Sequence, residues 1–260
     1  MITPSPMLHT LIELAQAAGK LIMEIYATDF VAHAKTDSSP VTEADERAEA
    51  LILKGLAQHF PNIPVIAEEA VAAGRIPEIQ NQFFLVDPLD GTKEFISCNG
   101  EFTVNIALVQ NGEVSAGIVY APAINTLYWG NLGQGSAKAI LNPDQPLPSA
   151  WQKIGVRSLP ASGATVLASR SHRDAATQAY LATVKVAELI GAGSSLKFCT
   201  IAEGKADLYP RFGRTMEWDT AAGHAVLAAA GGTVKGADGT PFLYGKKARG
   251  FDNPAFIASA

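Results

Sequence analysis

Apolar side chains recur every three or four positions through most of the first 60 residues, which is the spacing of an amphipathic helix. This spacing predicts helices over His9–Ala27 and Thr42–Phe60, and Thr42 followed three positions later by Asp45 is typical of an N-terminal helix cap. Continuous apolar runs bounded by turn residues come next, and such runs indicate buried strands. The predicted strands are Pro64–Ala67, Phe83–Val86, Phe102–Val109, Val114–Tyr120, Leu127–Asn131 and Ser136–Ile140.

The connections between these strands carry signals of their own. Asn111-Gly112 joins two apolar runs, and Asn-Gly in that setting is a strong hairpin signal. Ala70–Gln82 is predicted to be a loop. Leu141–Ala150 contains three prolines, so we expect a domain boundary there, with residues 1–150 before it and residues 151–260 after it.

Strands alternate with helices beyond that boundary. Such alternation is typical of a doubly wound α/β unit. The predicted strands are Thr165–Ser169, Val186–Ile190, Ala206–Tyr209, a strand beginning at Thr233, and Phe256–Ala258; the predicted helices are Ala175–Val184, Ser195–Glu203 and Asp219–Ala230.

Composition narrows the class of protein. Hydrophobic residues make up 48% and charged residues 17% of the 260, as in a globular chain. The net charge is −5 with no long basic run, so polymeric nucleic acid is not an expected partner. The two cysteines, Cys98 and Cys199, lack metal-site spacing and fit a reducing compartment.

The chain shows neither a signal-peptide pattern at its start nor an apolar stretch long enough to cross a bilayer. We therefore expect a cytoplasmic protein. Peripheral contact with the cytoplasmic face of the inner membrane stays open, and no obligate protein partner is evident.

The most informative stretch follows the predicted strand Phe83–Val86. Asp87 and Asp90 would repel each other at the mouth of this buried strand, and a divalent cation such as Mg²⁺ or Mn²⁺ relieves that repulsion. The amides of Gly91 and Thr92 would suit an anion if a helix begins there. Taken alone, the motif is equally compatible with an Asp-rich surface turn.

Two further acids stand at the ends of predicted elements. Glu68 directly follows the strand Pro64–Ala67, which repeats the arrangement of Asp87, although alone it reads as a solvated turn. Asp219 stands where the alanine-rich helix begins, where Asp is a favoured cap.

Asp87-Pro88-Leu89-Asp90-Gly91-Thr92 resembles the signature of the inositol monophosphatase superfamily of metal-dependent, lithium-sensitive phosphatases. The continuation Lys93-Glu94-Phe95 looks like its 3'(2'),5'-bisphosphate nucleotidase branch, and the resemblance extends over nearly the whole chain. It implies a layered α-β-α-β-α sandwich, with the metal site between the two halves.

The resemblance also implies roles for individual residues. It assigns two or three Mg²⁺ ions, with Mn²⁺ as an alternative, to Glu68, Asp87, the Leu89 carbonyl, Asp90 and Asp219, and Asp90 would bridge two ions. Asp45 would pair with the Thr92 hydroxyl, orienting and deprotonating the attacking water. The Gly91 and Thr92 amides would hold the phosphate, with Glu68 and Asp219 also facing the substrate.

Bisphosphate nucleotidases use a His, a Ser-x-x-Lys pair and an Arg to bind substrate. His172, Ser194, Lys197 and Arg211 match these in order, each near the end of a predicted element, where α/β sheets bind ligands. Each also fits an ordinary polar loop. Arg211 suits a second phosphate, because guanidinium groups bind phosphate bidentately.

The implied activity is Mg²⁺-dependent hydrolysis of adenosine 3',5'-bisphosphate to AMP and phosphate, which removes a by-product of sulfate assimilation. Activity on 3'-phosphoadenosine 5'-phosphosulfate stays open. An inositol or sugar phosphate phosphatase of the same superfamily is the first alternative, and Arg211 argues against it. A catalytically inactive metabolite-binding regulator is the second, and the intact acid set argues against that.

Overall fold

The computed structural model describes residues 2–28, 30–34, 40–142, 145–168 and 175–260. Its helices are α1 (Pro6–Tyr26), α2 (Glu43–His59), α3 (Glu68–Ala72), α4 (Thr92–Ile96), α5 (Ala175–Leu181), α6 (Leu196–Ala202) and α7 (Glu217–Ala229), with 3-10 turns η1 (Pro122–Ile124) and η2 (Lys247–Arg249). Its strands are β1 (Ala32–Ala34), β2 (Pro40–Thr42), β3 (Val65–Ala67), β4 (Gln82–Asp90), β5 (Thr103–Gln110), β6 (Glu113–Ala121), β7 (Thr126–Asn131), β8 (Gly135–Ile140), β9 (Gln152–Ile154), β10 (Ala164–Ala168), β11 (Val186–Gly191), β12 (Leu208–Arg211), β13 (Thr233–Gly236) and β14 (Phe256–Ser259).

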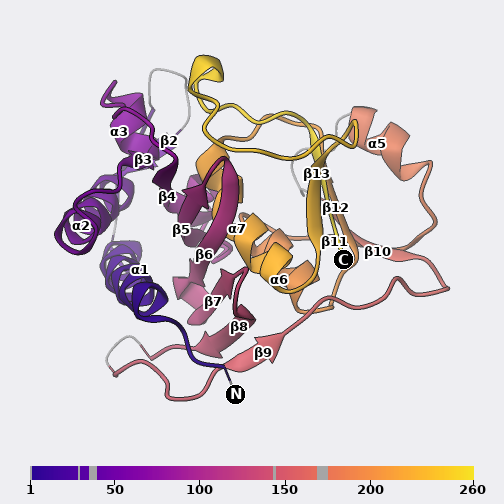
Figure 1. The fold of residues 1–260 in the computed structure, drawn as a ribbon, viewed down its shortest axis with the longest axis horizontal. Helices are drawn as coiled ribbons and strands as arrows, with labels where there is room; N and C mark the ends of the chain where they lie inside the picture. The colour runs from indigo at the N-terminus through magenta and orange to yellow at the C-terminus, as the bar shows by residue number, and fades with distance from the viewer. Residues whose placement is uncertain (1, 29, 35–39, 143–144, 169–174) are drawn as a thin grey trace.

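These elements form layers that follow one another from left to right in Figure 1. Helices α1 and α2 cover one face of a seven-stranded sheet, and α6 and α7 separate that sheet from a five-stranded sheet. The short helix α5 lies beyond the second sheet, against β12. The layered α-β-α-β-α architecture expected from the resemblance is confirmed.

The first sheet has the strand order β3-β4-β5-β6-β7-β8-β9, in which only β3 and β4 run parallel. The predicted hairpin joins β5 to β6 through Asn111 at φ 53° and Gly112 at φ 82°. Positive φ at both turn residues belongs to a type I′ turn, whose twist matches that of the strands. Strand β9 lies past residue 150, so the sheet extends beyond the predicted boundary, and the division into two domains stays a prediction.

Strand β4 is apolar without alternation because both of its faces are buried. Phe84 and Val86 pack into the core under α1 and α2, whereas Phe83 and Leu85 pack into the core around α6 and α7. The strand carries its terminal carboxylates into the middle of the molecule.

Strand β4 continues four residues beyond its predicted end at Val86, through Pro88 to Asp90. The pairing with β3 ends at Val86, and a register irregularity between Asp87 and Asp90 interrupts the pairing with β5. Pro88 lies within this irregularity, where proline is tolerated in a strand because no ladder bond from its nitrogen is required.

The second sheet has the order β11-β10-β12-β14-β13. Strand β10 runs parallel to β11 and β12, as the predicted alternation of strands and helices requires, but β14 is antiparallel to both of its neighbours. The sheet is therefore mixed rather than fully doubly wound, because β14 enters between β12 and β13.

Helix α7 packs unusually close to the first sheet, over paired glycines on β6 and β7. A Cβ atom on Gly117 would lie 2.6 Å from the Ala222 carbonyl oxygen, and one on Gly130 would lie 2.6 Å from the Ala225 carbonyl oxygen. This close approach sets the depth of α7, whose first turn carries Asp219.

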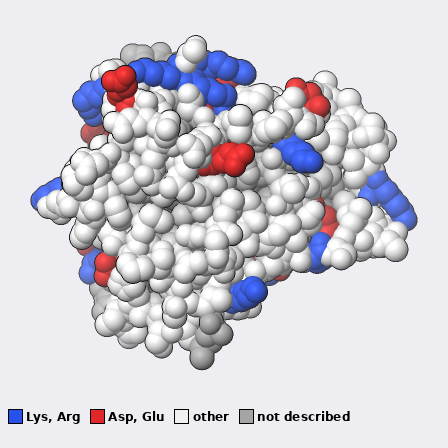
Figure 2. Space-filling view, in the orientation of Figure 1, with Lys and Arg blue, Asp and Glu red and all other residues white. Residues whose placement is uncertain are grey.

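Charged groups are sparse on the face shown in Figure 2, where Lys and Arg side chains gather along the upper edge, near η2. Within the described part of the chain, no helix combines the length and apolar character needed to cross a membrane.

Candidate active site

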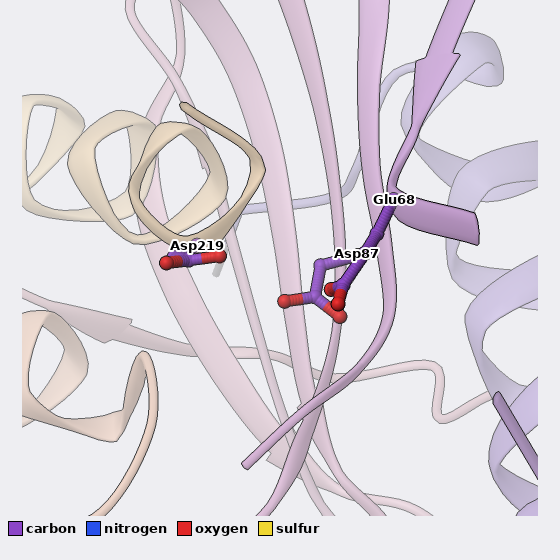
Figure 3. Close-up of side chains that lie close together, drawn as sticks. All are labelled: Glu68, Asp87 and Asp219. Carbon is purple, nitrogen blue, oxygen red and sulfur yellow. The ribbon is translucent and has the colours of Figure 1, made fainter. Parts of the chain in front are cut away.

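Three carboxylates from distant parts of the sequence meet between the two sheets. One oxygen each from Glu68, Asp87 and Asp219 lies within 4.8 Å of the others. Figure 3 shows Asp219 near the start of α7, opposite Asp87 and Glu68, which each follow the last residue paired between β3 and β4. The parallel pairing of β3 and β4 explains this meeting, because parallel strands end at the same edge of a sheet.

Local backbone structure fixes each member of this acid cluster. Glu68 is the first residue of α3, so the loop predicted from Ala70 begins only after Ala72. Asp87 Oδ1 accepts a hydrogen bond from the Leu89 amide at 3.0 Å. Helix α7 begins at Glu217, two residues earlier than predicted.

Asp219 therefore lies in the first turn of α7 and is not the N-cap residue. Its Oδ2 accepts a hydrogen bond from the Met216 amide at 2.8 Å, so it caps the helix from within the first turn. Capping the helix is thus compatible with membership of the acid cluster.

Burial and mutual repulsion disfavour the charged forms of these acids. Burial raises the pKa of Asp87 well above its usual range, and the carboxylates of Glu68, Asp90 and Asp219 raise it further. The pKa of Asp219 is raised in the same way, by burial first and then by Asp90 and Glu68. A multivalent cation among these carboxylates would favour their charged forms and so oppose both shifts.

Asp90 belongs to the same electrostatic group but is held differently. Its Oδ2 accepts hydrogen bonds from the Ser195 amide at 2.7 Å and from Asn105 Nδ2 at 3.4 Å. Burial raises its pKa to about 6, an effect that Lys197 and the Ser195 amide oppose.

Ser195 and Asn105 were not predicted from the sequence. Ser195 Oγ donates to the Asp219 carbonyl oxygen at 2.7 Å and accepts from Asn105 Nδ2 at 3.0 Å. Ser195 therefore connects Asp90 of the first sheet to the start of α7. No local pattern distinguishes Ser195 from its neighbour Ser194, and Asn105 lies within an otherwise ordinary apolar strand.

Thr92 and Asp45 are brought together as expected. Thr92 Oγ1 lies 3.2 Å from Asp45 Oδ1 and 3.4 Å from the Leu89 carbonyl oxygen. The other carboxylate oxygen of Asp45 accepts from the Thr42 amide and from the Thr42 hydroxyl, both at 2.7 Å. This capping box is the one predicted for α2, and it leaves Oδ1 directed at Thr92.

Gly91 precedes α4 with φ 96°, a left-handed conformation that glycine adopts without strain. The expected helix start at Thr92 is present, although α4 has only five residues. Gly91 also lines a pocket together with Asp90 and Asp219, so one of the two residues predicted to bind phosphate lies in the same pocket as these acids.

Lys197 and Arg211 line the same pocket. Lys197 Nζ donates to the Ser194 carbonyl oxygen at 2.7 Å and to the Ala192 carbonyl oxygen at 3.3 Å. Burial lowers its pKa to about 8, and although Asp90 raises this pKa, the Arg211 guanidinium lowers it further. Two cationic groups therefore repel each other here, as the acids do in the cluster.

The Arg211 side chain makes one hydrogen bond to the described residues. Its Nη2 donates to the Arg214 carbonyl oxygen at 3.1 Å, and its buried Nε has no hydrogen-bond partner among the described residues. Ser194 lines the pocket with φ 41°, and its Oγ accepts from Thr103 Oγ1 at 3.2 Å. His172, the fourth predicted substrate residue, lies outside the described residues.

The donor set fits a hard divalent cation. Carboxylate oxygens, with a backbone carbonyl beside them, are the ligands that Mg²⁺ and Mn²⁺ prefer. Nitrogen and sulfur ligands do not take part in the acid cluster formed by the described residues.

Comparisons with known proteins agree with this geometry. The model of the inositol monophosphatase family matches residues 3–255. The 3'(2'),5'-bisphosphate nucleotidase CysQ of Escherichia coli (strain K12) is 44% identical over 97% of this chain and 99% of its own length. The same nucleotidase of Buchnera aphidicola is 41% identical over 98% of this chain and 94% of its own length.

A solved structure of CysQ from Bacteroides thetaiotaomicron, described as a bacterial member of the inositol monophosphatase family, superimposes with a TM-score of 0.82. It is 39% identical, and the match covers 96% of each chain. Family match, sequence identity and fold coincide over nearly the full length, and this chain belongs to the metal-dependent inositol monophosphatase family.

Proposed function

We propose that this protein is a Mg²⁺-dependent 3'(2'),5'-bisphosphate nucleotidase that hydrolyses adenosine 3',5'-bisphosphate to AMP and phosphate. The observation that carries this proposal is one pocket lined by both acidic and cationic side chains. Asp90 and Asp219 are among its acidic residues, and Lys197 and Arg211 are among its cationic residues. A substrate with two phosphates matches this arrangement, since the cleaved group needs metal ions and the retained group needs cationic side chains.

The metal ions would be held by Glu68, Asp87, Asp90, Asp219 and the Leu89 carbonyl. When bound there, the ions would activate water and stabilise the leaving oxygen during in-line displacement at phosphorus. The number of ions, two or three, and a bridging position for Asp90 are part of the proposal. The amides of Gly91 and Thr92 would orient the 3'-phosphate.

The proton of the attacking water has a path through the protein. Thr92 Oγ1 directs its own proton toward Asp45 Oδ1, so its lone pairs can accept a proton from water on its other side. Asp45 is 2% exposed and is held by Thr42, which keeps its carboxylate aimed at Thr92 rather than at solvent.

The cationic residues Arg211 and Lys197 would bind the 5'-phosphate. The guanidinium of Arg211 has five N–H donors, and the described residues pair only one of its nitrogens, so it can bind phosphate through two parallel bonds. An anion bound by both groups would offset the repulsion between Arg211 and Lys197.

A matched set of phosphate esters tests the proposal. Phosphate release is measured from adenosine 3',5'-bisphosphate, 3'-AMP and inositol 1-phosphate, each with Mg²⁺ and with EDTA. We expect EDTA to abolish release. A charge-assisted bond contributes about 1.5–3 kcal/mol, so kcat/KM for the bisphosphate should exceed that for 3'-AMP by about 10- to 150-fold.

Two results would contradict the proposal. A kcat/KM for inositol 1-phosphate equal to that for the bisphosphate would favour the inositol phosphatase alternative. Release from none of the esters, by a folded protein with Mg²⁺ present, would favour a binding protein without catalysis.

A further inference from the structure

Glu49 is a buried carboxylate that lies outside the pocket. It belongs to α2, one turn after Asp45, and is 2% exposed. Both residues lie on the face of α2 that packs against the first sheet, among apolar neighbours such as Ala48 and Ile52. A carboxylate is rarely buried among such neighbours unless its oxygens are hydrogen-bonded.

The partners of Glu49 are at the start of α3. Its Oε2 accepts a hydrogen bond from the Glu69 amide at 2.7 Å. Burial raises the pKa of Glu49, whereas hydrogen bonds from the amides of Glu69 and Ala70 lower it. Glu69 and Ala70 are the second and third residues of α3, whose amides are the groups that an N-cap side chain normally binds.

Helix α3 has no cap of its own. Its N-cap residue is Ala67, which has no side chain able to accept a hydrogen bond. Glu49 therefore supplies from α2 the acceptor that the local sequence lacks. A negative charge at this position also interacts favourably with the helix dipole.

Glu68 is the first residue of α3, so the position of α3 determines where its carboxylate lies. The strand before it has three residues and the helix has five, and helices this short are not stable alone. The hydrogen bonds that Glu49 accepts from the amides of α3 are then a tertiary constraint on the position of Glu68.

We propose that Glu49 is a positioning residue that holds Glu68 in the acid cluster. Asp45, one turn earlier on the same helix, binds Thr92 at the start of α4. Helix α2 therefore holds two five-residue helices in one frame, and so fixes the predicted metal ligand relative to the predicted base. This inference rests on the metal centre of the proposed function, but not on the identity of its substrate.

Metal binding by the metal-free protein tests the inference without any assay of activity. Mn²⁺ is titrated into the wild type, Glu49→Ala and Glu49→Gln, and free Mn²⁺ is measured by electron paramagnetic resonance. Loss of a residue that orients a metal ligand typically weakens metal binding by about 10- to 100-fold, and we expect this of Glu49→Ala. Glu49→Gln keeps one acceptor oxygen, so its loss of affinity should be smaller but measurable.

Two control variants separate positioning from general stability and charge. Glu46→Ala removes an exposed carboxylate from the same helix, and Ile52→Ala leaves a cavity on the same buried face. Both should bind Mn²⁺ as tightly as the wild type, although Ile52→Ala should melt at a lower temperature.

Wild-type Mn²⁺ affinity in a folded Glu49→Ala protein would overturn the inference alone. If Glu49→Ala does not fold, wild-type affinity in Glu49→Gln would overturn it equally. A wild-type protein that binds no Mn²⁺ would overturn the metal centre as well.

Discussion

The acidic and the cationic residues of the site carry charge of opposite sign, and they are built differently. Carboxylates from β4, α3 and α7 meet between the sheets, and those of Asp87 and Asp219 accept hydrogen bonds from backbone amides. Lys197 and Arg211 come from the second half of the chain alone and donate to backbone carbonyls.

In both places burial moves a pKa away from the charged form and like charges move it further, upward for Asp87 and downward for Lys197. The difference lies in which elements each set of residues requires. The acidic residues depend on β4 of the first sheet, on α3 and on α7, so they suit chemistry that every substrate needs. The cationic residues depend on α6 and on the end of β12, so they suit selection among substrates.

The largest loss of activity should come from changing an acidic residue. Asp90→Asn keeps the shape of the side chain and an oxygen for the Ser195 amide, but removes a charge that the proposed metal site would use. Turnover should fall by more than the roughly 10²–10⁴-fold that a single general base contributes, and equally for all substrates. Steady-state kinetics measure this, with Asp238→Asn at an exposed turn as the control that should change nothing.

The melting temperature in EDTA completes that test. Removing one of several repelling carboxylates should leave the metal-free Asp90→Asn protein at least as stable as the wild type. Turnover within tenfold of wild type would rule out Asp90 as a metal ligand.

Thr92→Ala should have the next largest effect. It removes the hydroxyl that links water to Asp45, so kcat should fall by roughly 10²–10⁴-fold with little change in KM. Thr92→Ser restores the hydroxyl and should recover most of the rate. A strong rise in KM at unchanged kcat would instead make Thr92 a binding residue.

Arg211→Ala should distinguish the role of the cationic residues from that of the acidic residues. Losing a charge-assisted bond should lower kcat/KM for adenosine 3',5'-bisphosphate by about 10- to 150-fold. The value for 3'-AMP should change much less, because 3'-AMP has no 5'-phosphate. Arg214→Ala is the matched control, since Arg214 is exposed and pairs with Asp252. Equal losses on both substrates would show that Arg211 does not recognise the second phosphate.

The smallest expected effect is a pH dependence of the metal-free protein. The pKa of Asp90 is about 6 in the folded state, and those of Asp87 and Asp219 are also raised above their unfolded values. At these three acids the folded state therefore binds more protons than the unfolded state above pH ~4, and their contribution to stability falls as pH rises through pH 6. Burial lowers the pKa of His224 to about 4, so His224 acts in the opposite direction up to about pH 6.5.

Between pH 5 and pH 7.5 in EDTA, the melting temperature of the wild type should accordingly fall by several degrees relative to that of Asp90→Asn, which also keeps His224. At about 2–4 °C per kcal/mol for a chain near this length, calorimetry resolves the change. A wild-type melting temperature that rises relative to that of Asp90→Asn over this interval would contradict the raised pKa of Asp90.

The sequence predicted most elements because its apolar spacing is regular, but it placed some boundaries wrongly. Strand β4 runs past Pro88 because β3 ends earlier and a register irregularity removes the need for the missing amide. Helix α3 begins at Glu68 although Ala67 is a poor cap, because the acceptor comes from Glu49, 18 residues before Ala67 in the chain. Local patterns cannot reveal a cap supplied from another element.

The site residues also divide into those that a local sequence pattern predicts and those that it does not. Asp87 and Asp90 suggested a cation from their own spacing, whereas joining Glu68 and Asp219 to them required the family resemblance. Ser195 was missed because its bonds to Asp90 and to the Asp219 carbonyl appear only when the two halves are packed together. Its sequence context, between Ser194 and Leu196, is that of any polar loop before a helix.

The acid cluster also constrains the order of events in folding. Asp219 follows Asp87 by 132 residues (219 − 87), and it reaches the cluster only when α7 has settled over Gly117 and Gly130. Contacts that distant in sequence form late, after most of the chain entropy has been lost. Metal ions that require all three carboxylates therefore stabilise the native state but not the transition state for folding. Their presence should slow unfolding and leave the rate of folding almost unchanged.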